Sequence, residues 1–163
     1  MAAPVATIFG SARLVPGQEE YEDARVLGSL LAAAGWTVCT GGHDGAMAAV
    51  SRGAREAGGH VVGITLPDGA GRRRPNPWVS EERPAEDLFA LLRMLTAADA
   101  WLAVAGGVGT LAEVALAWNL VQIGTMAPRP LVLVGRRWRA LLDAFERELV
   151  IDGPDTRLVC WAP

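Results

Sequence analysis

The stretch WLAVAGGVGTLAEVA, residues 101–115, decides the fold. Residues 101–105 are apolar enough for a strand that is buried on both faces, and the residues from Thr110 to about 124 contain no helix breaker. Three glycines between these segments, Gly106, Gly107 and Gly109, allow the backbone to turn sharply and to approach a ligand closely. The stretch therefore predicts a strand, a glycine turn and a helix.

The start of this predicted helix favours a bound anion. Unpaired backbone N–H groups and a partial positive charge lie at a helix N-terminus, so a phosphate group is the expected guest. A purely structural interpretation stays open, because residues 110–113 fit a capping box in which Thr110 caps the helix and Glu113 bonds back to the cap's amide. A capping box does not account for three glycines, since one would suffice for the turn.

Composition limits the class of protein. The 163 residues fit one domain, residues 1–163, and the net charge of −3 argues against nucleic acids and acidic membranes as partners. The longest apolar region, residues 100–124, is interrupted by the glycines and contains Glu113, which argues against a membrane span. Cys39 and Cys160, in a chain without a signal-like start, are expected to be reduced thiols in a cytoplasmic protein.

The basic side chains exclude two chemistries. All 15 of them are arginines, so the chain has no lysine for a Schiff base with pyridoxal phosphate. The same absence excludes a Walker-type phosphate loop, which places a lysine on the nucleotide phosphates.

Two further turns are predicted to join the glycine turn at one edge of the sheet. A buried strand over residues 4–9 ends at Gly10 and Ser11, and a second strand over residues 36–40 leads into the GGHDG segment, residues 41–45, with Asp44 as the expected N-cap of the next helix. The first turn is not G-x-G-x-x-G, so NAD is not favoured. The candidate ligand-binding residues in these turns are Gly10, Ser11, Arg13, Gly41, Gly42 and Gly45, although Arg13 also fits a solvated loop arginine.

The chain after the third predicted strand, residues 60–66, supplies the remaining candidates. Residues 67–79 form a long aperiodic loop, which we interpret as a lid with Arg74 and Asn76 reaching inward or as a solvated basic loop. Residues 84–98 are predicted to be a helix that carries Arg93. His43 has no second ligand nearby in the sequence, so we predict neither a metal site nor a cofactor.

Residues 105–113, AGGVGTLAE, resemble the PGGxGTxxE signature of the LOG (Lonely Guy) family, whose members are often labelled possible lysine decarboxylases. The superfamily also contains molybdenum-cofactor carrier proteins. The resemblance extends from residues 9–11 through 40–42 and 58–59 to about residue 143, and Ala105 stands where the family usually has proline. Without a lysine, the decarboxylase label fails on chemistry.

The resemblance breaks in the predicted helix over residues 84–98. LOG enzymes carry an Arg-Lys pair there, and counting back from Met94 and Asp99 places Ala90 at the arginine and Leu91 at the lysine. Arg93 lies about one turn further along near the same face, where it either supplies the guanidinium from a displaced position or is an ordinary rim residue.

Alternating strands and helices predict an α/β fold, a single three-layer Rossmann-like domain with a mainly parallel sheet in the order 3-2-1-4-5. The resemblance implies a phosphoribohydrolase that cleaves a nucleoside 5′-monophosphate into free base and ribose 5-phosphate. Gly106, Gly107, Gly109 and Thr110 would then hold the phosphate, with Glu113 and Arg93 as the catalytic residues. A carrier or sensor of a phosphate-bearing small molecule is the alternative. The apolar third and fourth helices, and the resemblance, predict a homodimer.

Overall fold

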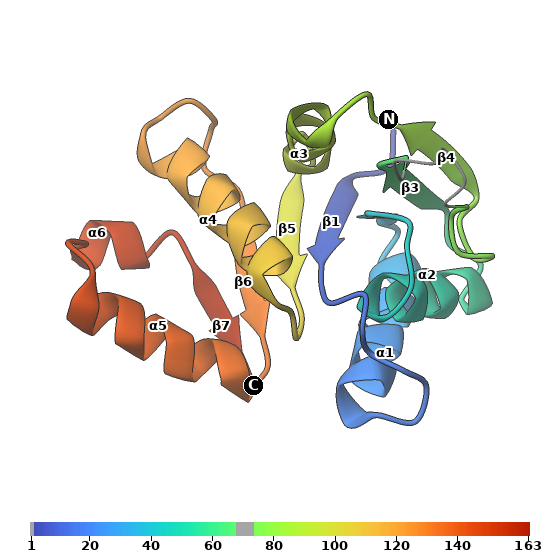
Figure 1. Ribbon diagram of the computed structural model, residues 1–163, viewed down its shortest axis with the longest axis horizontal. Helices are drawn as coiled ribbons and strands as arrows, with labels where there is room; N and C mark the ends of the chain where they lie inside the picture. The colour runs from blue at the N-terminus through green and yellow to red at the C-terminus, as the bar shows by residue number, and fades with distance from the viewer. Residues whose placement is uncertain (1, 68–73) are drawn as a thin grey trace.

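The computed structural model describes residues 2–67 and 74–163. One parallel seven-stranded sheet, in the order β4-β3-β2-β1-β5-β6-β7, organises this part of the chain (Figure 1). The strands are β1 (Val5–Phe9), β2 (Thr37–Thr40), β3 (Val61–Thr65), β4 (Glu81–Pro84), β5 (Ala100–Ala103), β6 (Leu131–Val134) and β7 (Cys160–Ala162). The helices are α1 (Glu19–Ala33), α2 (Ala46–Glu56), α3 (Leu88–Thr96), α4 (Val108–Gln122), α5 (Arg136–Glu148) and α6 (Gly153–Thr156).

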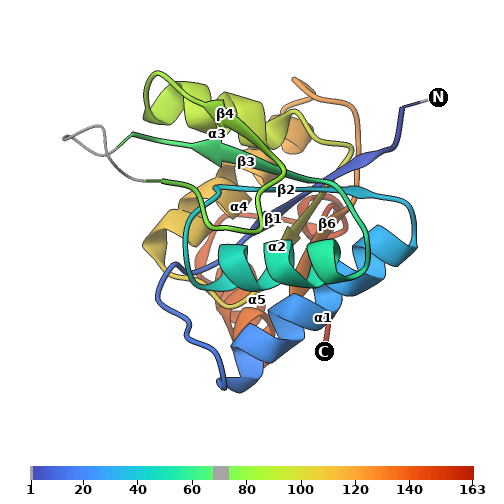
Figure 2. The ribbon, with the colours of Figure 1, turned by 90° about the vertical axis from the view of Figure 1, so that its right-hand side faces the viewer.

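Alternating apolar side chains build a core on each face of this sheet. In β1, Ile8 packs into a cluster with residues of α1 and α2, whereas Phe9 packs into a second cluster with residues of α3, α4 and α5. Alternate residues of a strand point to opposite faces, so these buried strands need apolar residues at nearly every position. Figure 2 shows α1 and α2 on one side of the sheet and α3 on the other. The α/β class with three layers is therefore confirmed.

The predicted strand order is correct for the five inner strands, β3-β2-β1-β5-β6, but incomplete at both edges. Residues 81–84 form β4, all exposed, beside β3, and the C-terminal residues form β7 beside β6. The predicted helix over residues 84–98 is correspondingly shorter, because Pro84 ends β4 and Asp87 caps α3 by accepting a hydrogen bond from the Ala90 amide at 2.7 Å.

The strand order reverses between β1 and β5: the strands that follow β1 in the chain are added on one side of it, and those that follow β5 are added on the other. The helix after β1 covers one face and the helix after β5 covers the other, so the loops beyond these two strands diverge. Open α/β sheets bind ligands in the crevice that such a divergence leaves at the carboxyl ends of the strands. Separately, no helix in the described part of the chain is long and apolar enough to cross a membrane.

Candidate functional site

Helix α4 begins three residues earlier than the capping box predicted. Its N-cap is Gly107, which has no side chain to cap the helix, so Thr110 is not the cap and the predicted capping box is wrong. Thr110 instead lies in the first turn and is buried beneath Gly106. A Cβ at Gly106 would lie 2.3 Å from both Cβ and Oγ1 of Thr110, so this contact requires glycine at position 106.

The first turn of α4 leaves three backbone donors available. The Leu111 amide is the first to make a helical hydrogen bond, to the Gly107 carbonyl at 2.9 Å, and the amides of Val108, Gly109 and Thr110 have no backbone acceptor among the described residues. Gly107, Val108 and Gly109 are exposed. We call the amides of Val108, Gly109 and Thr110 the α4 cradle. Together with the helix dipole they form a site suited to an anion.

The loop after β1 is held against the cradle by its backbone. The Ser11 amide donates to the Ala105 carbonyl at 3.0 Å, and the Ser11 carbonyl accepts from the Ala46 amide, at the start of α2, at 2.8 Å. Gly45 is the N-cap of α2 and makes no side-chain cap bond, so the predicted Asp44 cap is wrong. Two main-chain bonds therefore bring the ends of β1, β2 and β5 together.

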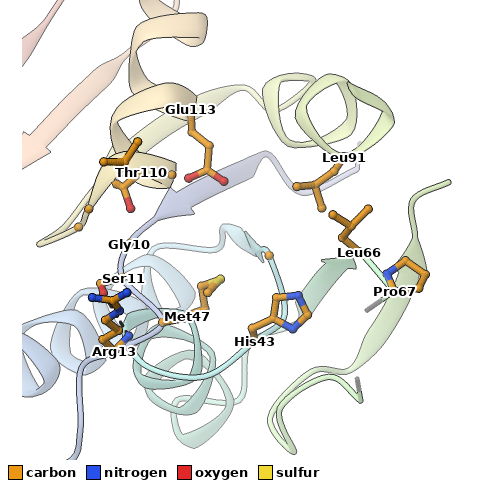
Figure 3. A pocket seen from close by; sticks show the side chains of 16 residues that line it. Gly10, Ser11, Arg13, His43, Met47, Leu66, Pro67, Leu91, Thr110 and Glu113 are labelled. Carbon is orange, nitrogen blue, oxygen red and sulfur yellow. Dashed lines mark hydrogen bonds between the residues drawn. The ribbon is translucent and has the colours of Figure 1, made fainter. Parts of the chain in front are cut away.

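A cavity of about 880 Å³ opens between these loops (Figure 3). It is large enough for a nucleotide-sized ligand. Nine of the residues predicted from the sequence line it, and they come from three separate loops and α4: Gly10, Ser11, Arg13, Gly41, Gly106, Gly107, Gly109, Thr110 and Glu113.

Glu113 is the carboxylate of this cavity. It lies one turn into α4, and Figure 3 shows its side chain directed into the space between α4 and Met47. Partial burial raises the pKa of Glu113 to about 7, because the charged form loses water. A carboxyl group with this pKa exchanges a proton readily near neutral pH, as a general base or acid must.

Five predicted site residues do not line the cavity. Arg93 and Arg74 are exposed on the surface. Gly42 and Gly45 are buried, with φ of +71° and +68°, and shape the loop behind the cavity. Asn76 is buried as well, and its amide nitrogen donates to the His43 carbonyl at 2.9 Å while its Oδ1 accepts from the Trp78 amide at 3.1 Å.

Asn76 therefore holds the His43 loop in place through this hydrogen bond and does not line the cavity. The predicted lid over residues 67–79 can be assessed only at its ends, because residues 68–73 lie outside the described residues. Pro67 lines the cavity, and none of the described residues 74–80 does.

Sequence reasoning missed the apolar part of the cavity. Its lining also includes the apolar residues Ala12, Met47, Leu66, Pro67, Leu91 and Val108, together with the polar His43. The position of Leu91 was signalled by its alignment with the lysine of the LOG Arg-Lys pair, whereas Met47 and Leu66 resemble ordinary core residues in the sequence. Among the described residues no cluster of three or more His, Cys, Asp and Glu could hold a metal ion.

Comparison with known proteins identifies the family of the chain. Residues 3–127 match the SLOG cluster4 family. A cytokinin riboside 5′-monophosphate phosphoribohydrolase of Mycobacterium tuberculosis is 34% identical over 164 residues, covering 89% of this chain and 87% of the relative. A relative of the same name from Mycobacterium marinum is 32% identical, with the same coverage.

Two solved structures share the fold. The molybdenum cofactor binding protein from Rippkaea orientalis superposes with a TM-score of 0.79 at 24% identity, covering all of this chain and 91% of that one. The molybdenum cofactor carrier protein from Chlamydomonas reinhardtii gives a TM-score of 0.73 at 26% identity, covering 99% of this chain and 90% of that one. By its family match and its mycobacterial relatives, the chain belongs to the LOG-like SLOG cluster4 family.

Proposed function

We propose that the protein is a phosphoribohydrolase, which hydrolyses the N-glycosidic bond of a nucleoside 5′-monophosphate and releases free base and ribose 5-phosphate. The observation that carries the proposal is the presence of an open amide cradle and a partly buried carboxyl group, Glu113, on the same helix and in the same cavity. The named activity of the mycobacterial relatives supports it.

In this mechanism the α4 cradle holds the 5′-phosphate, with Thr110 and Ser11 beside it. Glu113 lies one turn further along α4, and its Cβ tilts back toward the helix N-terminus, so its carboxylate faces the sugar of a ligand anchored there. The bond between C1′ and the base nitrogen breaks, and its electron pair leaves with the base, which takes up a proton. Glu113 stabilises the cationic ribosyl transition state or accepts a proton from the attacking water.

The test is to incubate the protein with a panel of nucleoside 5′-monophosphates and to measure ribose 5-phosphate. We expect Glu113→Gln to lower release by about 10²- to 10⁴-fold, the usual contribution of a general base. Glu146→Gln, an exposed position on α5, is the matched control and should release product at the wild-type rate. Release that survives Glu113→Gln unchanged would refute this mechanism.

A carrier of a phosphate-bearing small molecule is the second candidate. It is favoured by the absence of the LOG Arg-Lys pair: Ala90 and Leu91 occupy those positions, and Arg93 does not line the cavity. Arg13 is the only arginine among the described lining residues, and it is exposed. If the protein binds monophosphates tightly but releases no ribose 5-phosphate from any of them, the carrier function replaces the hydrolase.

We also propose that the protein is a cytoplasmic homodimer that pairs through α3 and α4. Leu88 and Phe89 on α3 are 52% and 77% exposed, and Ile123 at the end of α4 is 62% exposed. Exposed apolar side chains of this size on neighbouring helices are typical of an interface between protein chains.

A further inference from the structure

His43 places an imidazole ring at the end of the cavity away from the α4 cradle. In Figure 3 this ring lies on the far side of Met47 from Ser11 and Arg13, which share the end of the cavity where the cradle lies. The residue is partly buried. A nucleotide whose phosphate is bound at the cradle, and whose sugar lies beside Glu113, therefore has its base near this imidazole.

Contacts with distant parts of the chain hold the backbone of His43 in this place. The buried Asn76 donates from its backbone amide to the Gly42 carbonyl at 2.7 Å and from Nδ2 to the His43 carbonyl at 2.9 Å. Gly42 has a φ of +71°, and a Cβ there would lie 2.8 Å from Cγ2 of Thr65. The loop is thus fixed at two successive carbonyls, and a fixed loop gives a side chain the constant position that proton transfer requires.

Hydrolysis of a glycosidic bond requires an acid for the leaving group as well as a base for the water. When the bond between C1′ and the base breaks, its electron pair goes to the base, and a nitrogen of the base takes up a proton. Glu113 cannot supply that proton in the same step in which it accepts one from the attacking water. Sites that cleave glycosidic bonds by direct attack of water therefore divide the two roles between two groups.

We propose that His43 is the acid of this reaction: its protonated imidazole donates a proton to a ring nitrogen of the leaving base while water attacks C1′. Imidazole is the side-chain group that most often transfers protons in catalysis. The hydroxyl group of the water joins C1′, its proton goes to Glu113, and the base leaves as a neutral molecule. Glu113 then loses its proton to bulk water and His43 gains one from it, so no net proton is consumed. This inference rests on the proposed hydrolase and adds a catalytic residue to it.

The experiment compares a leaving group that needs a proton with one that does not. The first substrate is the nucleoside 5′-monophosphate that the wild type cleaves fastest. The second is 4-nitrophenyl β-ribofuranoside 5-phosphate, which carries the same phosphate and releases 4-nitrophenolate, a stable anion. We expect His43→Gln to lower kcat by about 10²- to 10⁴-fold with the nucleotide, the usual contribution of a general acid, but by less than about threefold with the nitrophenyl compound.

The controls separate proton donation from other effects of the substitution. Glu113→Gln should slow both substrates, because the same water attacks both. His60→Gln changes the chain's other histidine, which is exposed and lies 3.3 Å from Glu81, and it should cleave both substrates at the wild-type rate. Binding of ribose 5-phosphate with wild-type affinity shows that each variant is folded and that its cradle is intact. If His43→Gln does not fold, His43→Asn removes the same acid with a shorter side chain.

The outcomes distinguish this inference from the proposed hydrolase. If the wild type releases ribose 5-phosphate and His43→Gln slows both substrates equally, the hydrolase stands and His43 only shapes the cavity. An unchanged kcat with the nucleotide would also overturn the role of His43. So would a wild type that cleaves the nucleotide but not the nitrophenyl compound, because a leaving group that needs no proton should leave more easily. If the wild type releases ribose 5-phosphate from no nucleotide, the hydrolase and the inference fail together.

Discussion

The amide of Ser11 donates to the carbonyl of Ala105 at 3.0 Å, which joins the loop after β1 to the residue that precedes the glycine turn. The carbonyl of the same Ser11 accepts from Ala46 at the start of α2. Main-chain bonds thus hold the part of the cavity wall that Ser11 forms, so substitutions that displace Ser11 should open the site.

Gly45→Ala is such a substitution. A Cβ at Gly45 would lie 2.2 Å from the Ser11 carbonyl oxygen, and its φ of +68° is unfavourable for alanine. We expect a loss of unfolding free energy of about 2–4 kcal/mol, in the range of strain combined with a steric clash. Gly58→Ala is the control, because Gly58 has a φ of +79° but open space around it, and it should lose only about 1–2 kcal/mol. Urea unfolding measures the unfolding free energy of both variants. Equal losses of unfolding free energy would show that the Ser11 contact is unimportant.

The α4 cradle can be tested by removing one donor. Val108 is the first residue of α4, where proline is tolerated, and Gly107 before it is extended, as a residue before proline prefers. Val108→Pro should therefore fold but bind ribose 5-phosphate at least about tenfold more weakly, because a hydrogen bond to a charged group contributes about 1.5–3 kcal/mol. Val108→Ala keeps the amide and should bind normally. Calorimetric titration distinguishes the two, and unchanged affinity in Val108→Pro would exclude that amide from the site.

The raised pKa of Glu113 makes stability depend on pH. The folded protein binds this proton more tightly than the unfolded chain, so the associated stability is present below the pKa of an unfolded glutamate, about 4.3, and is lost as the pH rises through about 7. Between about pH 5 and about pH 8 the wild-type protein should lose on the order of 2 kcal/mol relative to Glu113→Gln. Urea unfolding of both proteins at the two pH values gives the difference, and parallel pH profiles would show that Glu113 titrates normally.

The proposed dimer predicts a monomeric variant. Phe89 is 77% exposed, so Phe89→Asp should leave the fold intact while placing an unpaired charge in the interface of α3 and α4. Sedimentation velocity should then report a dimer for the wild type and a monomer for the variant. Val150→Asp is the control and should remain dimeric, because Val150 is fully exposed and remote in sequence from both helices. Phe145→Asp would be a poor control, because Phe145 packs on Trp118.

The inner sheet and the position of the site could be predicted because strong local patterns encode them. Buried strands that alternate with helices leave few possible topologies, and glycine turns at strand ends indicate the binding edge. The edge strand β4 could not be predicted, because Glu81–Pro84 is exposed and charged and has no apolar alternation.

Side-chain roles within the loops were harder to predict than backbone positions. Asn76 and Arg74 are two residues apart in one polar segment, yet one is buried against the His43 carbonyl and the other is exposed. Thr110 fits a capping box in the sequence, but Gly107 is the N-cap of the helix and Thr110 packs against Gly106 in its first turn. The burial of Asn76 depends on a contact with a residue 33 positions away, which no short motif records.

Because the anion donors and Glu113 belong to one rigid helix, the spacing between them is set by the helical pitch of about 5.4 Å and not by the closing of a loop. The helix thus fixes the distance from the bound phosphate to the carboxylate. Analogues whose phosphate is one methylene nearer to or farther from the sugar should still bind at the cradle but place the wrong bond beside the carboxylate. The residues that contact the base can differ between relatives without changing this distance.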